Sequence, residues 1–153
     1  MVLAESHRLR IGRRSEAGRS YLVTVSCAHR RILFDRIEPV RCLATAIALA
    51  SSDVRTWCWV AMPDHFHWLF ELPAGPTLSS TVQKAKSMTT RCLRQTGSFA
   101  GPVWQRGFHD RAIRKDEDLR TAARYVIANP LRAGLAESIG DYPFWDASWL
   151  DPN

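Results

Sequence analysis

Apolar and polar positions alternate over three short segments of the chain, which is the pattern of half-buried β-strands. Residues 21–28 (YLVTVSCA) alternate in this way and include β-branched side chains. Residues 54–62 and 65–72 are two further strand-like runs, separated only by Pro63 and Asp64. Because the interval between these runs is so short, we expect them to form a β-hairpin.

Two other segments have the spacing of amphipathic helices. Apolar residues recur at helical intervals through residues 38–51, which are rich in alanine and leucine. Residues 77–95 predict a basic helix, with Thr77 or Ser79 as its N-cap and Gly97 just beyond its end. The sequence therefore predicts one helix before the hairpin and one after it.

The last third of the chain predicts one more helix and an aromatic tail. Acidic residues at 116–118 complement the dipole of a helix in its first turn, and Pro130 ends that helix. Residues 104–113 are a short strand or an ordered loop, and their pattern does not decide between the two. We expect the tail to pack back on the domain through its aromatic residues, which are Tyr142, Phe144, Trp145 and Trp149.

The order of these elements, β-α-β-β-α-(β)-α, contains a split β-α-β arrangement. This order favours an α+β fold in which an antiparallel sheet carries helices on one face. A chain of 153 residues, 46% of them hydrophobic, fits one globular domain better than two small ones. We place that domain at residues 20–153. Residues 1–19 lack periodicity and carry five arginines, so we expect a flexible basic arm there.

The sequence does not favour a membrane-spanning protein or a protein with a cysteine-based functional site. No apolar run approaches the roughly eighteen residues of a membrane helix, and the N-terminus has no cleavable apolar stretch. A cytoplasmic protein without a membrane partner is therefore expected. No two cysteines form a C-x-x-C pair, which argues against a zinc ribbon or a thioredoxin-like site. We expect four reduced and mostly buried thiols, at Cys27, Cys42, Cys58 and Cys92.

Positive charge is concentrated in two windows of the chain, whose net charge is +6. Residues 1–36 hold eight arginines against three acids, and residues 84–114 hold seven lysines or arginines against one acid. Such segregation suits a nucleic-acid partner, because each neutralised phosphate releases counterions; a solvated basic surface is the alternative. Aromatic residues among the cations favour single-stranded nucleic acid. The candidate contacts are Arg8, Arg10, Arg13, Arg14, Lys84, Lys86, Trp104, Arg106, His109, Arg111 and Arg114.

His65 and His67 are two positions apart in a predicted strand. Strand side chains alternate, so both imidazoles point to one face and Phe66 points to the other. Two neutral ring nitrogens at this spacing can share one cation. The alternative is an incidental pair, with one histidine in the core and the other in solvent. Met62 and Pro63 favour the metal site, because a turn fixed by proline orients the histidine that follows it.

Tyr125 lies beside the buried stripe of the predicted last helix. That stripe consists of Leu119, Ala122, Ala123 and Val126. Tyr125 stacks along the helix with Thr121 and Asn129, four residues before and after it. These polar neighbours suit a functional site better than the core, although a tyrosine covering the sheet edge is the alternative.

The tyrosine and the histidine pair together suggest phosphoryl chemistry. A phenol has a pKa near 10 and is a poor nucleophile at neutral pH, so it needs an electrophile polarised by a cation. A metal on His65 and His67 would polarise a DNA phosphate by binding one of its non-bridging oxygens. Asn129 would supply a third, oxygen ligand.

Three segments resemble the single-tyrosine HUH transposases, which are insertion-sequence-200-like transposases, and most closely the REP-associated tyrosine transposases. Residues 62–69 (MPDHFHWL) are similar to the segment M-P-N/D-H-x-H-x-L of that family. Residues 104–108 (WQRGF) contribute to the resemblance. Residues 124–135 (RYVIANPLRAGL) are similar to the block R-Y-I-x-x-N-P-x-R-A-G-L, and an aromatic-proline pair at 142–143 follows. The resemblance covers roughly residues 20–149.

The resemblance implies a ferredoxin-like (RRM-like) fold of the HUH endonuclease type. It implies a Mg²⁺- or Mn²⁺-dependent enzyme, a monomer or homodimer, that binds DNA hairpins with palindromic repeats and cuts single-stranded DNA. Cleavage would pass through a 5′-phosphotyrosine on Tyr125, with His65, His67 and Asn129 as metal ligands. The N-terminal arm would read bases beside the hairpin.

Two other functions are open from the residues alone. A sheet of this topology also suits a non-catalytic module that recognises palindromic repeats by stacking bases. Zinc-dependent hydrolysis of a small molecule is disfavoured, because no third histidine or clear carboxylate ligand lies nearby in the sequence.

Overall fold

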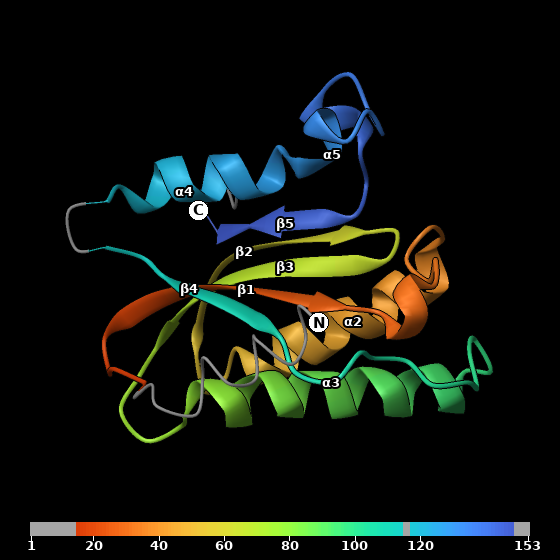
Figure 1. The fold of residues 1–153 in the computed structure, drawn as a ribbon, viewed down its shortest axis with the longest axis horizontal. Helices are drawn as coiled ribbons and strands as arrows, with labels where there is room; N and C mark the ends of the chain where they lie inside the picture. Colours follow the sequence, from red (N-terminus) through yellow and green to blue (C-terminus); the bar gives the residue numbers. More distant parts are fainter. Residues whose placement is uncertain (1–14, 115–116, 149–153) are drawn as a thin grey trace.

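An antiparallel sheet of five strands forms the centre of the computed structural model, which describes residues 15–114 and 117–148. The strands follow the order β4-β1-β3-β2-β5 across the sheet (Figure 1). They are β1 (Arg19–Ser26), β2 (Arg55–Met62), β3 (His65–Leu72), β4 (His109–Ala112) and β5 (Trp145–Ala147). The predicted α+β fold with an antiparallel sheet is thereby confirmed. Within the described ranges, no helix combines the length and the apolar character needed to cross a membrane.

Two helices, α2 (Ile37–Ala50) and α3 (Leu78–Gln95), cover one face of the sheet side by side. The core beneath them includes Phe66, Trp68 and Phe70 of β3, which are fully buried because alternate strand residues point to this face. Helix α3 begins after Thr77, whose side chain accepts a hydrogen bond from the backbone N–H of Ser80. Both helices lie within one residue of their predicted positions.

Helix α4 (Leu119–Ile127) covers the opposite face of the sheet, so the molecule has three layers. Val126 of α4 packs there against Val60 of β2 and Leu69 of β3 in a second apolar core. The expectation that the helices share one face is correct for α2 and α3 and wrong for α4. The reason is that β2 and β3 are apolar on both faces, which leaves a second apolar surface for the stripe of α4 to bury.

The last helical segment ends differently from the prediction. Helix α4 ends at Ile127, and a short helix α5 (Asn129–Arg132) follows after Ala128. Pro130 lies in the first turn of α5, where the missing N–H of a proline costs no hydrogen bond. Pro130 therefore belongs to a second short helix and does not itself end the first.

The aromatic tail packs back on the sheet as predicted. After a 3-10 turn, η2 (Ile139–Asp141), the Tyr142 hydroxyl donates a hydrogen bond to the carbonyl of Ala61 at 2.5 Å. Phe144 and Trp145 pack against the same core, whereas Trp149 lies outside the described residues. Strand β5 at the sheet edge was not expected, since three residues are too few to show alternation.

The N-terminal boundary of the folded part lies slightly before residue 20. Gly18 donates its N–H to the carbonyl of Leu72 at 2.7 Å, and Ser15 accepts a hydrogen bond from the N–H of Leu78 at 2.9 Å. Residues 15–19 of the expected arm thus contact the domain. The remaining arm residues, Arg8, Arg10, Arg13 and Arg14 among them, lie outside the described residues.

Cys42 of α2 and Cys92 of α3 form a disulfide, with their Cα atoms 5.4 Å apart. The expectation of four reduced thiols is therefore wrong for these two residues. A separation of 50 residues hides the pair in the sequence, and only the packing of α2 on α3 brings the sulfurs together. Cys27 and Cys58 are free and buried, and burial raises the pKa of each thiol to about 12.

Candidate active site

His65 and His67 lie at the start of β3, on the sheet face that α4 covers. Their Nε2 atoms are 3.2 Å apart, and the two rings are nearly perpendicular, at 84°. Phe66 between them points to the opposite face and is fully buried. The predicted alternation is confirmed, and both imidazoles present one nitrogen to the same point.

Each imidazole is held in place through its other nitrogen. Nδ1 of His65 lies 2.7 Å from a carboxylate oxygen of Asp64, and the other oxygen of Asp64 accepts a hydrogen bond from Nε of Arg30 at 2.9 Å. Nδ1 of His67 lies 2.8 Å from the hydroxyl of Thr24. Such outer partners fix the ring orientation and the tautomer of a metal-binding histidine.

The surroundings of the pair favour a neutral imidazole at His67 and an ionised carboxylate at Asp64. Burial, followed by electrostatic repulsion from His65 and Arg132, lowers the pKa of His67 to about 3. Burial alone would raise the pKa of Asp64, but its hydrogen bonds with His65 and Arg30 bring that pKa below its ordinary value. Neutral imidazole is the form that binds a metal ion, so His67 is in its metal-binding form at neutral pH.

The donor set fits two ligands of one divalent cation. A carboxylate only accepts hydrogen bonds, so His65 carries its hydrogen on Nδ1 and directs the lone pair of Nε2 at Nε2 of His67. Two ligand nitrogens bound at right angles to one ion, each about 2.1 Å from it, lie about 3 Å apart. Among the residues that the structure describes, no group of three His, Cys, Asp or Glu side chains is suited to a metal ion. A third ligand from this described part of the chain would therefore be of another residue type.

Tyr125 projects from α4 toward solvent, with 61% of its surface exposed. Its neighbours Ala122, Ala123 and Val126 are buried, which confirms its predicted place beside the apolar stripe. The guanidinium of Arg132 lies 3.8 Å from the centre of the tyrosine ring and donates a hydrogen bond to the carbonyl of Tyr125 at 2.6 Å. The same guanidinium contributes to the lowered pKa of His67, so one cation is close to both the phenol and the histidine pair.

Asn129 is the first residue of α5 and lies one turn after Tyr125. Its side-chain amide donates a hydrogen bond to the carbonyl of Val126 at 2.8 Å. Within the described ranges, its side-chain oxygen accepts no hydrogen bond, so this atom is available to a ligand. The predicted role of Asn129 as a metal ligand stays a prediction.

The sequence model of one protein family, described as IS200-like transposase, matches residues 19–129. The matched range includes His65, His67, Tyr125 and Asn129. The chain belongs to the IS200-like transposase family. The match extends over most of the chain, and it starts where β1 starts.

This transposase is similar to two curated relatives over part of their length. It is 31% identical over 87 residues to the REP-associated tyrosine transposase of Escherichia coli (strain K12), covering 56% of this chain and 50% of that protein. It is 32% identical over 94 residues to a putative REP-associated tyrosine transposase of Haemophilus influenzae (strain ATCC 51907 / DSM 11121 / KW20 / Rd), covering 54% and 53%. The chain thus spans about half the length of the curated relatives it matches.

Solved structures agree with the sequence comparison. A REP-associated tyrosine transposase bound to a REP hairpin matches with a TM-score of 0.71 and 27% identity, over 87% of this chain and 79% of that one. The resemblance and the fold predicted from the sequence are thereby confirmed. A bacterial tRNA(His) guanylyltransferase-like protein in complex with ATP matches with a TM-score of 0.54 and 11% identity, over 87% and 66%, which shows a similar fold alone.

Two predicted DNA contacts of the transposase lie on the face of the histidine pair. In the register of β1 and β4, His109 is opposite Thr24 and Arg111 is opposite Leu22. Directly opposite residues share a face, so both side chains extend this surface toward the sheet edge, where both are exposed. Arg111 also forms an ion pair with Glu117 at 3.0 Å, and its hydrogen bonds lower the pKa of that carboxyl. Arg114 follows β4 and is exposed.

The other predicted contacts lie on α3 or beside it. Lys84 is exposed and paired with Asp53 at 2.7 Å, whereas Arg106 is exposed. Lys86 is only 7% exposed, and its ammonium donates to backbone carbonyls, which argues against a direct phosphate contact. Trp104 is half-buried beside it. The structure therefore divides the predicted contacts between the two sides of the sheet.

Sequence reasoning gave no role to four residues of the site, namely Thr24, Arg30, Asp64 and Arg132. Thr24 reaches His67 through the pairing of β1 with β3, and strand register across the sheet is not visible in local periodicity. Asp64 and Arg132 stand inside the segments that carry the family resemblance, and this was the only signal that pointed to them.

Proposed function

We propose that this transposase is a divalent-metal-dependent endonuclease and strand transferase that acts on single-stranded DNA beside a hairpin. The observation that carries the proposal is the histidine pair, with its Nε2 atoms 3.2 Å apart on the face that the Tyr125 helix covers. The solved relative bound to a REP hairpin supports hairpin DNA as the partner of this chain. In this chain, Tyr125 on α4 and Asn129 on α5 have the spacing Tyr-x-x-x-Asn, which supports a tyrosine nucleophile.

The reaction exchanges one phosphoester bond for another. The hydroxyl oxygen of Tyr125 attacks the phosphorus atom, and the bond to the 3′ oxygen of the preceding nucleotide breaks. The phenol proton passes to solvent, and the departing 3′ oxygen gains a proton. The products are a 5′-phosphate bound to tyrosine and a free 3′-hydroxyl, and attack by another 3′-hydroxyl would rejoin the strand.

Held by His65 and His67 with Asn129 as a third ligand, Mg²⁺ or Mn²⁺ would draw electron density from a non-bridging oxygen of the phosphate and favour this attack. Imidazoles are not the hardest ligands, so Mn²⁺ is as suitable as Mg²⁺. Arg132 restrains the Tyr125 ring and places positive charge where the phosphate becomes more negative in the transition state. Asp64 and Thr24 keep the imidazoles of His65 and His67 oriented.

Replacement of the nucleophile tests the proposal. We expect Tyr125→Phe to abolish covalent attachment to a labelled hairpin oligonucleotide and to preserve binding, because only the reacting hydroxyl is removed. Denaturing gels report the adduct, and an electrophoretic shift reports binding. Tyr142→Phe is the matched control, since the Tyr142 hydroxyl donates a hydrogen bond to the carbonyl of Ala61 and takes no part in the proposed reaction, and this variant should still form the adduct.

Two results would contradict the proposal in different ways. An adduct in Tyr125→Phe would show that another residue is the nucleophile. A non-catalytic module for palindromic repeats would instead be favoured by two results together. These are hairpin binding that EDTA does not change, and no cleavage of any hairpin substrate by the wild-type chain.

A further inference from the structure

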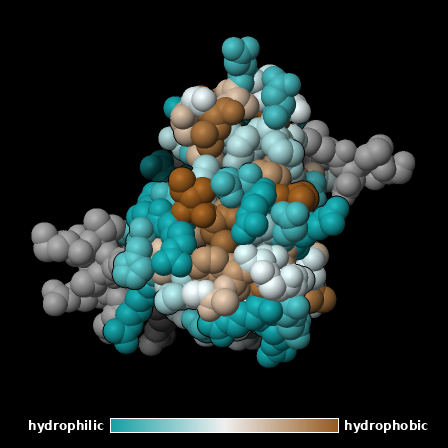
Figure 2. All heavy atoms as spheres, turned by 90° about the vertical axis from the view of Figure 1, so that its right-hand side faces the viewer, coloured by the Kyte–Doolittle hydropathy of each residue, from teal (hydrophilic) through white to brown (hydrophobic). Residues whose placement is uncertain are grey.

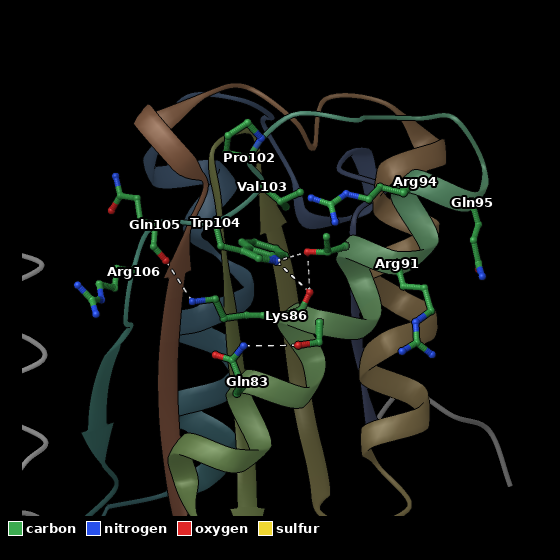
Figure 3. A pocket seen from close by; sticks show the side chains of 12 residues that line it. Gln83, Lys86, Arg91, Arg94, Gln95, Pro102, Val103, Trp104, Gln105 and Arg106 are labelled. Atoms are coloured by element: carbon green, nitrogen blue, oxygen red, sulfur yellow. Dashed lines mark hydrogen bonds between the residues drawn. The ribbon is translucent and has the colours of Figure 1, made fainter.

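A pocket of about 720 Å³ lies between α3 and the segment of residues 102–106, on the opposite side of the sheet from Tyr125. Arg91 and Arg94 line it from the helix, and Arg106 lines it from the facing segment (Figure 3). None of the residues that line the pocket is acidic. The proposed cleavage chemistry gives this pocket no role.

The three arginines carry charge that the fold does not neutralise. In the part of the chain that the structure describes, Arg91, Arg94 and Arg106 are exposed and form no ion pair. Lys84 and Arg111, by contrast, each have a carboxylate partner. Uncompensated cations around a hollow concentrate positive potential there, which attracts an anionic ligand.

The wall of the pocket is fixed by buried hydrogen bonds. Lys86 is 7% exposed and donates to the carbonyls of Gln105 at 3.1 Å and Gly107 at 3.3 Å. The indole N–H of Trp104 donates to the carbonyl of Lys86 at 3.0 Å and lies 3.1 Å from the hydroxyl of Thr90 (Figure 3). A rigid wall keeps its ligand-binding groups in place before the ligand arrives, which lowers the entropy cost of binding.

Trp104 gives the pocket an aromatic surface beside its cations. Its ring packs against Phe34 and Phe66 of the core and also lines the pocket. Arg94 extends from α3 toward this ring in Figure 3. Guanidinium groups next to an aromatic ring are the combination that binds single-stranded nucleic acid, because phosphates pair with the cations and a base stacks on the ring.

One end of the pocket reaches the end of the sheet that holds the histidine pair. The N–H of Gln105 donates to the carbonyl of Ser26 at 2.9 Å, and Ser26 is directly opposite His65 in the sheet. Arg30 bridges the same two places, since it donates to Ser26 and to Asp64. Figure 2 views this end of the molecule, where hydrophilic residues surround a few hydrophobic ones. Gln105 and Arg30 therefore connect the pocket with the histidine pair at this end of the sheet.

We propose that this pocket is a second DNA-binding site, which holds single-stranded nucleotides that flank the hairpin. Arg94 and Arg106 bind phosphates, and Trp104 stacks against a base. A pocket of about 720 Å³ takes a nucleotide or two, whereas a double helix is too wide to enter it. The proposal rests on the proposed function for its substrate, but its test requires no cleavage.

The test measures DNA binding by fluorescence anisotropy, with the full chain in EDTA. One labelled oligonucleotide is a blunt hairpin, and the other carries a single-stranded flank on the same hairpin. The variants are Arg94→Gln, Arg106→Gln and their combination. Arg55→Gln is the control, because Arg55 is an exposed arginine at the far end of β2 from the histidine pair.

The combined variant should bind the flanked hairpin about tenfold more weakly. Its affinity for the blunt hairpin, and the affinity of the control variant for either oligonucleotide, should change less than twofold. The slope of log affinity against log salt should fall by about 1.4, or about 0.7 for each lost contact with a single strand. An equal loss of affinity for both oligonucleotides, or no loss of affinity for either of them, would overturn the proposal. A wild-type chain that forms the covalent adduct but has no preference for the flank would overturn this proposal alone. If the combined variant loses affinity only for the flanked hairpin, but the wild-type chain forms no covalent adduct, only the proposed cleavage would be overturned.

Discussion

The imidazole of His67 is surrounded by groups that oppose its protonation. It is largely buried, and the charges of His65 and Arg132 add to the cost of a proton there. In the unfolded chain the same side chain takes up a proton near its ordinary pKa of about 6.5. Protonation of His67 therefore favours unfolding over the interval between these two pKa values.

We predict that the metal-free chain loses stability as the pH falls below about 6.5. Between that value and a pKa of about 3 in the folded state, the unfolded chain binds one more proton at His67. One such proton lowers the free energy of unfolding by up to about 1.4 kcal/mol per pH unit. Urea denaturation in EDTA at a series of pH values measures this slope, which should be smaller in His67→Gln. The same slope in both proteins would contradict the assignment.

The residues of the site differ in how far the sequence could predict them. That His65 and His67 share a face, and that Tyr125 lies beside the buried stripe, follows from the local periodicity of a strand and of a helix. The contact of Thr24 with His67 depends on the pairing of distant strands. The stacking of Arg132 on Tyr125 was not predicted, because the expected helix ended at Pro130 and so left Arg132 outside it.

At the scale of elements, α2 and α3 are joined both by packing and by a covalent bond. The disulfide between Cys42 and Cys92 closes a segment that contains the β2–β3 hairpin and hence the histidine pair. A crosslink of this kind stabilises the fold mainly by restricting the unfolded chain. Its effect grows with the length of the closed loop.

Opening this disulfide is expected to lower the free energy of unfolding by about 4 kcal/mol, the value that loop entropy gives for a separation of 50 residues. Urea denaturation of the wild-type chain with and without dithiothreitol measures the difference. In Cys42→Ser the reductant should have no further effect, which controls for the buried thiols of Cys27 and Cys58. Identical transitions of the oxidised and reduced wild type would show that the bond contributes no stability.

Most elements could be located from the sequence, whereas their arrangement was only partly predictable. Hydrophobic periodicity marks which side of α4 is buried, but it does not say which face of the sheet will receive that side. The apolar side chains of Cys58, Val60 and Leu69 provide this face, and they stand in runs that are apolar on both sides. Strand β5 is too short for any period to appear.

For the molecule as a whole, the proposed cleavage chemistry lies on one side of the sheet and the basic pocket on the other. Within one chain, Arg132 stacks on Tyr125 and also contributes to the lowered pKa of His67, so the proposed nucleophile and the histidine pair have one cation in common. On this basis we expect one chain to complete the proposed site by itself.

We predict that two inactive variants do not complement one another. A mixture of His67→Ala and Tyr125→Phe chains should form no DNA adduct, since each chain lacks one half of its own site. Gel analysis of the mixture tests this, with wild-type chain added to each variant as the positive control. Restored adduct in the mixture would show that a partner copy supplies the tyrosine, and it would favour the homodimer over the monomer.

The joint at Ala128 has one more consequence. Tyr125 lies three residues before it, and Asn129 and Arg132 lie one and four residues after it, so the relative placement of the three side chains depends on this short stretch of backbone. One inserted or deleted residue there would turn the later two by about 100° relative to the tyrosine. Evolution or design can therefore exchange individual side chains in this stretch more easily than it can change the count of residues between them.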